Sequence, residues 1–451
     1  MDRTLLLRAL ALYVPILLAT ILGRQRLRTK RHIAAIVCGL SWALPSLLLL
    51  QVFNVRFHWW SFHAHGGLIR GAPVDLWLGW AILWGVLPVL IFPRLNPWLL
   101  AAAFVCLDLV LMPRCAPLIE LSNRWLVGEM VAVCMVLLPA LFFARWTWDA
   151  AHLNARVLFQ VLAMTGLLFF FLPEIIFALT GRGSWQLLFA PHLLSARWAK
   201  SLELQTIVLL AIAGASAAQE FARRGLGTPL PFDPPQRLVC SGLYRYVGSP
   251  MQISGALVLM AWGLLLQSWW LFAAGPLTFI YSAGLAGWHE NENMLGRFGE
   301  RWLLYRRNVP KWRPRWKPWH DPIAPIPWLY IAEECGPCSE VRRWFEARRP
   351  VALEIVAAED HPTRNLTRIT YDPMDGTAPE EGVAAFARAL EHINLAWAYT
   401  GVYFRLPVVR TLVQLLIDAG GLGPKMVERR SCSVDHGLTN DGLTNSAPRR
   451  R

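Results

Sequence analysis

The sequence predicts a polytopic α-helical membrane protein of about nine spans with a C-terminal soluble α/β domain, and three observations lead to this fold class. Hydrophobic residues make up 55% of the 451-residue chain and its mean hydropathy is +0.37, which lies outside the range of soluble globular proteins. Nine apolar windows are long enough to cross about 30 Å of hydrocarbon. A Pro-rich stretch at 321–327 then separates these windows from a segment with the composition of a soluble domain.

The nine apolar windows define the membrane region. They lie at roughly 4–23, 33–53, 73–92, 98–112, 125–143, 157–179, 204–222, 251–268 and 270–288. The first six form an N-terminal region, 1–203, in which no motif indicates a function. The first window resembles a signal peptide, but no small-residue cleavage site follows it, so we expect a retained span.

Positive charge predicts the orientation of the spans. The net charge of +14 comes mainly from Lys and Arg in short loops beside apolar windows, as positive-inside bias produces, so we expect no nucleic-acid partner. The loop 24–32 holds five of these residues and is predicted to be cytoplasmic. Alternation then places 223–250 and everything after 289 on the same side. We expect a multi-pass protein of a bacterial inner (plasma) membrane with a cytoplasmic C-terminal domain, the bacterial source being inferred from the domain fusion.

Two polar features of the N-terminal region stand out. Asp108 and Glu129 lie within predicted spans, where they are either protonated or hydrogen-bonded between helices, or line a substrate cavity. His58, His63 and His65 crowd among aromatic residues in a loop. These histidines have no acidic or Cys neighbour in sequence, which favours an interfacial aromatic loop over a metal site, and we predict no metal.

A polar loop ending at residue 250 is the first candidate site. Ser249 is a good helix N-cap and Pro250 fits the first helical position, so a helix N-terminus with free N–H groups is predicted there. After two further spans the chain returns to the same face with Glu290 and Glu292. A helix N-terminus with Arg245 on one side and a Glu on the other complements the carboxylate, ammonium and sulfonium of S-adenosylmethionine. The alternative is an ordinary capped span with solvated charges.

The motifs in this part of the chain resemble those of a known family. They are Gly-x-Gly-Thr-Pro from 225 with Asp233-Pro-Pro, then Leu-Val-x-x-Gly-x-Tyr-Arg-Tyr-Val-x-x-Pro-Met over 238–251, and Glu-x-x-x-Met-x-x-x-Phe-Gly-x-x-Trp-x-x-Tyr-x-x-x-Val-Pro-x-Trp-x-Pro over 290–314. Together these motifs resemble the isoprenylcysteine carboxyl methyltransferase and phospholipid N-methyltransferase group of integral membrane enzymes, over about 219–316.

The resemblance implies an S-adenosylmethionine cofactor, a lipid or lipid-modified acceptor and a core domain over 204–320. Pro250 and Glu290 match cofactor-pocket positions of the family, and Gly242, Tyr244 and Tyr246 match positions that shape the loop. The family's Arg-His or Arg-Asn before the proline is replaced by Gly248-Ser249, and Gln252 stands where the family often has Tyr. Either Arg245, Ser249 and the helix N-terminus supply the missing contacts, or cofactor affinity is weak or lost. For an amine acceptor, Glu290 or Glu292 is the nearest candidate base.

The second candidate site is Cys335-Gly-Pro-Cys338. We predict strands at 327–333, 351–356 and 368–371 and helices at 338–348, 380–393 and 410–418. A Cys-x-x-Cys at a strand-to-helix junction is typical of a thioredoxin-like redox site, where the helix N-terminus favours the thiolate of the first cysteine. A zinc site would need a second pair of ligands, and a structural thiol pair is the remaining alternative.

The segment 328–425 also resembles the DCC-type thiol-disulfide oxidoreductase family. The resemblance rests on Glu334-Cys335-Gly-Pro-Cys338, Gly382-Val-Ala-Ala-Phe and Arg405-Leu-Pro-Val-Val-Arg410, with Glu333-Glu334 in place of the family's Asp-Gly. It implies redox chemistry at the two cysteines and a cytosolic thiol reductant as partner. The polar tail 426–451 is expected to be disordered.

Three functional hypotheses follow from these features. The first is methyl transfer from S-adenosylmethionine to a lipophilic carboxylate or amine, with an appended redox domain. The second is a membrane-anchored thiol-disulfide oxidoreductase whose methyltransferase-like core is a non-catalytic anchor. The third is a membrane scaffold without catalytic activity.

Overall fold

The structure is a computed structural model that describes residues 3–116, 118–181, 183–188, 197–229, 235–283 and 285–429, with side chains of 197–199 and 281–291 outside the description. The chain forms two compact units. Unit 1 contains Met1–Asp321 together with Asn394–Tyr403, and unit 2 contains Pro322–Ile393 and Phe404–Arg451. Residues 430–451 of the predicted tail and Asp233 of the first motif lie outside the described residues.

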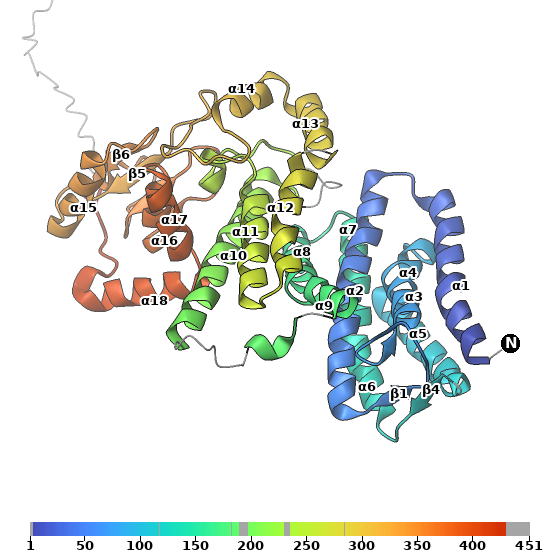
Figure 1. Ribbon diagram of the computed structural model, residues 1–451. Helices are drawn as coiled ribbons and strands as arrows, with labels where there is room; N and C mark the ends of the chain where they lie inside the picture. The colour runs from blue at the N-terminus through green and yellow to red at the C-terminus, as the bar shows by residue number, and fades with distance from the viewer. Residues whose placement is uncertain are drawn as a thin grey trace, which may run out of the picture. The chain divides into compact units, whose positions relative to one another are not determined.

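Unit 1 is a helical assembly whose apolar helices match the predicted windows (Figure 1). Its N-terminal helices are α1 (Arg3–Arg26), α2 (Lys30–Phe57), α3 (Val74–Gly85), α4 (Leu87–Ile91), α5 (Pro97–Leu111), α6 (Trp125–Ala132), α7 (Leu138–Trp148), α8 (Leu153–Gly166) and α9 (Leu172–Thr180). Single π-helical turns, η2 (Val133–Leu137) and η3 (Leu167–Phe171), join α6 to α7 and α8 to α9.

Seven helical segments in the described part of the chain are long and apolar enough to cross a membrane. They are Arg3–Arg26, Lys30–Phe57, Val74–Ile91, Pro97–Cys115, Trp125–Trp148, Leu153–Thr180 and Lys200–Gly225. The last lies within α10 (Arg197–Gly225). These seven segments coincide with the first seven predicted windows, and they support a multi-pass membrane protein.

The described residues support seven of the nine predicted spans, and the last two windows contain shorter apolar helices. They are α11 (Pro250–Leu265) and α12 (Trp269–Ala283), which are apolar but only 16 and 15 residues long. At a rise of about 1.5 Å per residue, α11 covers roughly 24 Å, which is less than the thickness of the hydrocarbon.

One end of the N-terminal helices is closed by short strands, seen at the bottom of Figure 1. β1 (Trp60–Phe62) pairs antiparallel with β4 (Ile119–Leu121), and β2 (Leu68–Ile69) pairs with β3 (Ala72–Pro73). The turn after α2 is held by Asn54, whose Oδ1 accepts hydrogen bonds from the backbone N–H groups of Trp59 and Trp60 and whose Nδ2 donates to Trp60 O. A buried side-chain amide thus supplies the hydrogen bonds that the chain reversal removes from the backbone.

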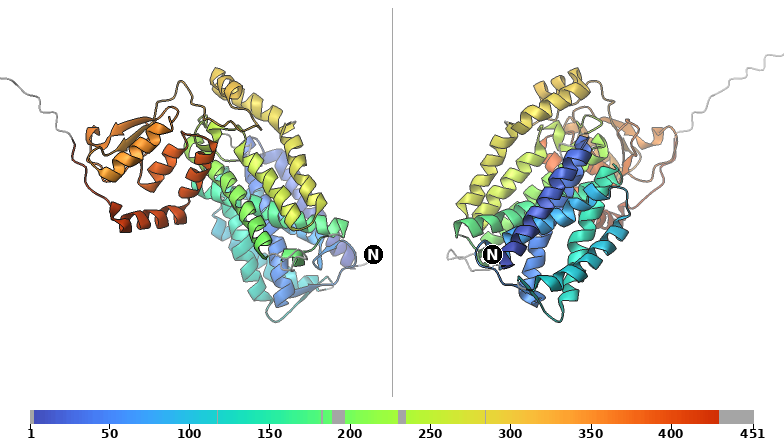
Figure 2. Two further views of the ribbon diagram at one scale, coloured as in Figure 1. Left: turned by 60° about the vertical axis from the view of Figure 1, so that its left-hand side comes forward. Right: turned by 90° about the vertical axis from the view of Figure 1, so that its right-hand side faces the viewer.

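Two glycines allow α2 and α3 to approach closely. A Cβ at Gly39 of α2 would lie 2.0 Å from the Gly85 backbone O of α3, and a Cβ at Gly85 would lie 2.8 Å from Gly39 O. α1 packs on the other side of α3, where a Cβ at Gly79 would lie 2.0 Å from Ala11 O. The right-hand view of Figure 2 shows α1 at the front of these helices. Close backbone approach through small residues is a common way for membrane helices to associate.

Unit 2 contains a four-stranded sheet. Its strands are β5 (Trp328–Ile331), β6 (Glu354–Ala357), β7 (Thr370–Asp372) and β8 (Glu380–Glu381), in the order β6-β5-β7-β8. β5 is parallel to β6 and antiparallel to β7, and β7 is antiparallel to β8. The helices are α15 (Gly336–Ala347), α16 (Val383–Leu390) and α18 (Pro407–Ile417).

The predicted helix 380–393 is wrong at both ends. Glu380 and Glu381 form β8 instead, and α16 begins only after Gly382, whose φ of +61° interrupts the helical backbone.

Residues Asn394–Tyr403, most of α17 (Leu395–Phe404), belong to unit 1, where Ala398 and Val402 pack with Ala213 and Tyr246. In the predicted tail, Val427 donates its backbone N–H to Leu366 O.

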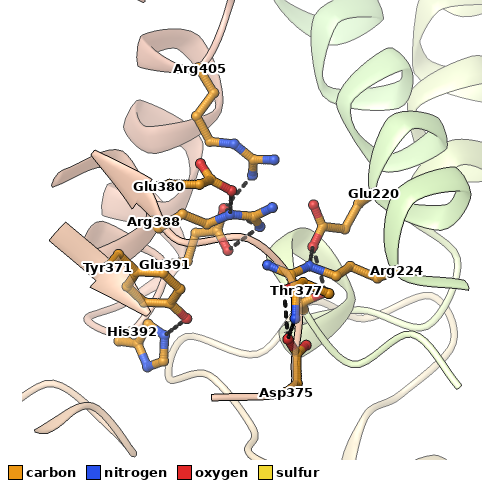
Figure 3. Close-up of polar contacts among 11 residues, drawn as sticks. Glu220, Arg224, Tyr371, Asp375, Thr377, Glu380, Arg388, Glu391, His392 and Arg405 are labelled. Atoms are coloured by element: carbon orange, nitrogen blue, oxygen red, sulfur yellow. Dashed lines mark hydrogen bonds and ion pairs between the residues drawn. The ribbon is translucent and has the colours of Figure 1, made fainter. Parts of the chain in front are cut away.

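A buried ion network stabilises α16 (Figure 3). Arg388 Nε lies 2.8 Å from Glu380 Oε1, and its Nη1 lies 3.3 Å from the carboxylate of Glu391, which also binds Arg405 at 2.6 Å. Tyr371 Oη lies 3.1 Å from His392 Nε2. Each buried charge in this group has an opposite charge beside it, as burial of ions requires.

We predict that Gly39→Ala destabilises unit 1. The new methyl group would overlap the Gly85 carbonyl, and overpacking of this kind costs about 1–3 kcal/mol. The thermal midpoint of detergent-purified protein, followed by circular dichroism, should fall. Gly255→Ala in α11 is the matched control, because a Cβ there meets no atom within 4 Å. Equal midpoints for the two variants would contradict the close approach.

Candidate functional site

The polar loop between α10 and α11 is anchored on α10. Its 3-10 turn, η5 (Gly242–Arg245), follows Ser241, whose Oγ donates to Glu220 Oε1 at 2.5 Å. Gly242 has a φ of +59°, and a Cβ there would lie 3.3 Å from Glu220 Cγ. Arg224 Nε lies 3.8 Å from the same Glu220 oxygen (Figure 3). A buried carboxylate on α10 therefore sets the conformation of the loop, and Gly242 fits both its backbone angle and its space.

The backbone of the loop is held by α14 (Glu300–Asn308) and by the segment that follows it. Tyr305 Oη donates to Tyr244 O at 2.9 Å. The other bonds are backbone–backbone: Arg315 N to Tyr246 O, Trp319 N to Arg245 O, and Gly248 N to Pro310 O, at 2.9, 2.9 and 3.0 Å. Tyr244, Arg245 and Tyr246 are all buried. The two sequence motifs, about sixty residues apart, are thus brought together.

The helix N-terminus expected at residue 250 is present. α11 begins at Pro250 with Ser249 at the N-cap position, but the Ser249 side chain makes no capping hydrogen bond. In the first turn, Gln252 Oε1 is buried without a hydrogen-bond partner among the described residues, and so is Thr228 Oγ1 of the Gly-x-Gly-Thr-Pro motif. Buried acceptors without partners are costly, so each is a candidate contact for a ligand.

Glu290 and Glu292, expected after the two spans that follow the loop, lie in α13 (Leu285–Phe298). The side chain of Glu290 is outside the described residues, and Glu292 is exposed. Nearby on α13, Asn293 Oδ1 accepts a hydrogen bond from Lys30 Nζ at 3.4 Å. This bond brings the basic loop 24–32 beside α13, so the two segments that the charge pattern assigned to one face lie at the same end of unit 1.

A charged cluster lies behind the loop. Cys240 is flanked by Asp321, Arg301 and Arg245, and Arg301 also binds the buried carboxylate of Asp321. Burial, with the charge of Asp321, raises the pKa of Cys240 to about 12. Cys240 is therefore a neutral packing residue beside charged groups of both signs, Asp321, Arg301 and Arg245.

The Cys-x-x-Cys pair lies where β5 leads into α15. Cys335 occupies the N-cap position of α15, Pro337 lies in its first turn, and both thiols are free and partly exposed. They pack beside Tyr330, Ala358 and Leu366. A thiol at a helix N-terminus next to a second thiol is an arrangement that permits an intramolecular disulfide.

A buried carboxylate lies beside this pair. Glu359, in the 3-10 turn η6 (Ala358–Asp360) after β6, accepts backbone hydrogen bonds from Glu333 N at 3.0 Å and Glu334 N at 3.5 Å. Burial, contact with the Cys335 thiol and the charge of Glu359 together raise the pKa of Cys338 to about 12. Cys338 is therefore a protonated thiol at neutral pH.

The two adjacent glutamates before Cys335 have a smaller electrostatic effect than their number indicates. Glu333 Oε1 lies 2.7 Å from Arg342 Nη1, and Arg342 also binds Glu346 on α15. The carboxylate that acts on the thiol pair is Glu359 instead, which sequence analysis missed. Its only sequence signal is a charged residue directly after a buried strand, which is weak because most such residues are solvated.

The structure also places the polar residues of the N-terminal region. His63 Nε2 lies 2.9 Å from Glu120 Oε2 across the β1–β4 ladder, and the described residues contain no cluster of three metal-ligating side chains. Asp108 of α5 and Glu129 of α6 meet each other, and both line one small cavity.

Comparisons with protein-family models, with curated proteins and with solved structures find no match.

We predict that Glu359→Gln lowers the pKa of Cys338, because it removes the negative charge that opposes the thiolate. At a pH below this pKa, each unit of decrease gives about tenfold more thiolate. Alkylation of Cys338 by iodoacetamide in reduced protein should therefore become several-fold faster, as measured by mass spectrometry. Glu354→Gln on the exposed side of β6 is the control. An unchanged rate in Glu359→Gln would show that the carboxylate has no electrostatic effect on the thiol.

Proposed function

We propose that this chain is an integral membrane methyltransferase that transfers the methyl group of S-adenosylmethionine to a lipophilic carboxylate or amine. The observation that carries the proposal is the packing of the loop 242–248 on the segment 305–319 by four hydrogen bonds. The residues that resemble the membrane methyltransferase family are therefore assembled into one structure, although they are far apart in sequence.

The residues near the start of α11 suit S-adenosylmethionine. The unpaired N–H groups of the first turn favour a carboxylate. The buried Gln252 Oε1 is an acceptor suited to an ammonium group. Thr228 Oγ1 offers a further polar contact from the Gly-x-Gly-Thr-Pro segment. These residues offer replacements for the family's Arg-His or Arg-Asn pair, which is absent here.

When bound, S-adenosylmethionine supplies a methyl group on a sulfonium that needs no covalent activation by the protein. The tasks left to the chain are to align the acceptor and to exclude water. Gly242, Tyr244, Arg245, Tyr246, Ser249 and Pro250 would form the loop side of the site. A carboxylate acceptor needs no base, whereas an ammonium acceptor must lose a proton, for which Glu290 or Glu292 is the proposed recipient.

A lipophilic acceptor agrees with the surface beside this site. α11 and α12 expose large apolar side chains, including Leu257, Leu264, Leu277 and Ile280. Such a surface faces lipid in a multi-pass protein. An acceptor with a lipid chain would approach the loop along these helices, and its polar end would remain at the interface.

We predict saturable S-adenosylmethionine binding to detergent-purified protein by calorimetry, and methylated product when a lipid extract is added. Gln252→Leu should weaken binding about tenfold to a hundredfold, because a hydrogen bond to a charged group contributes about 1.5–3 kcal/mol. Glu290→Ala should also weaken it. Gln205→Leu on the exposed side of α10 is the matched control.

Absence of saturable binding to the folded wild type would refute the proposal and favour a non-catalytic membrane core. Binding that is unchanged in both Gln252→Leu and Glu290→Ala would place the cofactor elsewhere.

We propose in addition that unit 2 is a thioredoxin-like thiol-disulfide oxidoreductase domain. The strand order β6-β5-β7-β8, with Cys335 and Cys338 at the junction of the central strand β5 and α15, favours this activity. In the reaction, the two thiols lose two electrons and two protons and form one disulfide, while a substrate disulfide is reduced to two thiols. A cytosolic thiol reductant would restore the pair, if unit 2 faces the cytoplasm of a bacterial inner membrane as the charge pattern predicts.

We predict that Cys335 and Cys338 form an intramolecular disulfide in oxidising glutathione buffers. The loss of two thiols per chain should be measurable by thiol titration and should disappear in Cys335→Ser and Cys338→Ser. Cys115→Ser, which removes a thiol remote in sequence from the pair, should retain it. If no intramolecular disulfide forms at any accessible glutathione potential, the thiol pair has a structural role.

A further inference from the structure

A cavity within the N-terminal helices contains two buried carboxyl groups and two buried indole N–H groups. Asp108 of α5, Glu129 of α6, Trp60 of β1 and Trp84 of α3 line it, and they are 6%, 5%, 7% and 4% exposed. The other lining residues are apolar. Of the residues that line the cavity, Asp108 and Glu129 are the only titratable ones.

Each of the four polar side chains has an unsatisfied atom. Trp60 Nε1, Trp84 Nε1, Asp108 Oδ2 and Glu129 Oε1 are buried without a hydrogen-bond partner among the described residues. The set therefore contains two donors and two acceptors. This is the complement of one water molecule, which accepts two hydrogen bonds and donates two. The indole N–H groups disfavour a metal cation, because they direct positive charge into the cavity.

The size of the cavity agrees with this match. It leaves about 20 Å³ of accessible space, enough for about one water molecule. Trp60 is held in place by Asn54 and by contact with Gly128, where a Cβ would lie 2.5 Å from Trp60 Cζ3. The indole beside Glu129 is thus positioned by packing, and a larger occupant would have to displace it.

The two carboxyl groups lie within hydrogen-bonding reach of each other. Two carboxylates in contact, in an apolar surrounding and with no ion-pair partner among the described residues, cannot both keep their charge. One proton held between the two carboxyl groups removes the repulsion. It also supplies the donor that a hydrogen bond between two carboxyl groups requires. Glu174 is the contrasting case in the same unit, because Arg70 binds its two oxygens at 2.8 and 2.9 Å and Trp185 donates to it as well.

A second cavity lies beside this group. It shares Leu47, Leu50, Trp60 and Trp80 with the first cavity and continues to Gln51, Ala72 and Pro73 beside the β2–β3 hairpin. The carboxyl pair therefore lies next to a cavity at the end of the helices that carries the strands.

We propose that Asp108, Glu129, Trp60 and Trp84 form a buried proton-binding site, in which the carboxyl pair shares one exchangeable proton and one water molecule bridges the pair to the two indoles. The site lies in the region 1–203 and is independent of the methyl-transfer and redox proposals. It gives the N-terminal helices a chemical role that their sequence does not indicate.

Infrared spectroscopy of the purified full-length protein near neutral pH tests the site, with the spectrum of each variant subtracted from that of the wild type. The C=O stretching band of a protonated carboxyl should be present in the wild type and lost in both Asp108→Asn and Glu129→Gln. The control, Glu174→Gln, should lose no such band, because Arg70 binds both oxygens of Glu174. In D₂O the band should shift without unfolding, since the proton exchanges.

The water bridge is tested with Trp60→Phe and Trp84→Phe, which keep the aromatic ring but remove one donor each. The carboxyl band should move to a different frequency in both, because the water that bonds to the pair loses a partner. A wild-type spectrum with no band that depends on Asp108 or Glu129 would overturn the proton site. A band that shifts in D₂O only after unfolding would overturn exchange, and a band unaffected by both Trp substitutions would overturn the bridge.

Discussion

The structure depends on one constraint, which is that a polar group buried among apolar helices must find a partner. Unit 1 satisfies it in three ways. Asn54 takes over the hydrogen bonds of a chain reversal, Arg70 neutralises Glu174, and Glu220 holds the loop after α10 through Ser241. The contact between Arg70 and Glu174 joins segments that are far apart in sequence, so it also sets the position of α9 relative to the hairpin of β2 and β3. The same constraint makes any remaining unsatisfied group informative about function.

The two proposed enzymatic sites differ in the interactions that define them. The loop 242–248 is held by backbone hydrogen bonds, and the proposed ligand contacts beside it are Gln252 and Thr228 rather than the residue pair of the family that its motifs resemble. The Cys335–Cys338 pair is compact, and its chemistry is modified by Glu359, a residue from another strand connection. The first site is thus defined by the hydrogen bonds that hold the loop 242–248, whereas the second is defined by the charge of Glu359 beside the Cys338 thiol.

Much of the secondary structure could be predicted, because hydropathy and charge are local properties. The first seven apolar windows coincide with long helices, and strands β5 to β7 lie where apolar runs indicated them. The failures have local causes as well. α11 ends before its window does, and Gly382 separates a short strand from a helix that the pattern had joined to it.

The sequence by itself determined that the chain is a multi-pass membrane protein with a distinct C-terminal segment and a cysteine pair at a strand-to-helix junction. Composition, periodicity and short motifs carry that information. Only the tertiary structure decided that Asp108 meets Glu129 beside two indoles, that Glu359 lies next to Cys338, and that Tyr305 binds the loop at Tyr244. Contacts between residues far apart along the chain depend on how helices and strands pack, and packing is not encoded in any single local stretch.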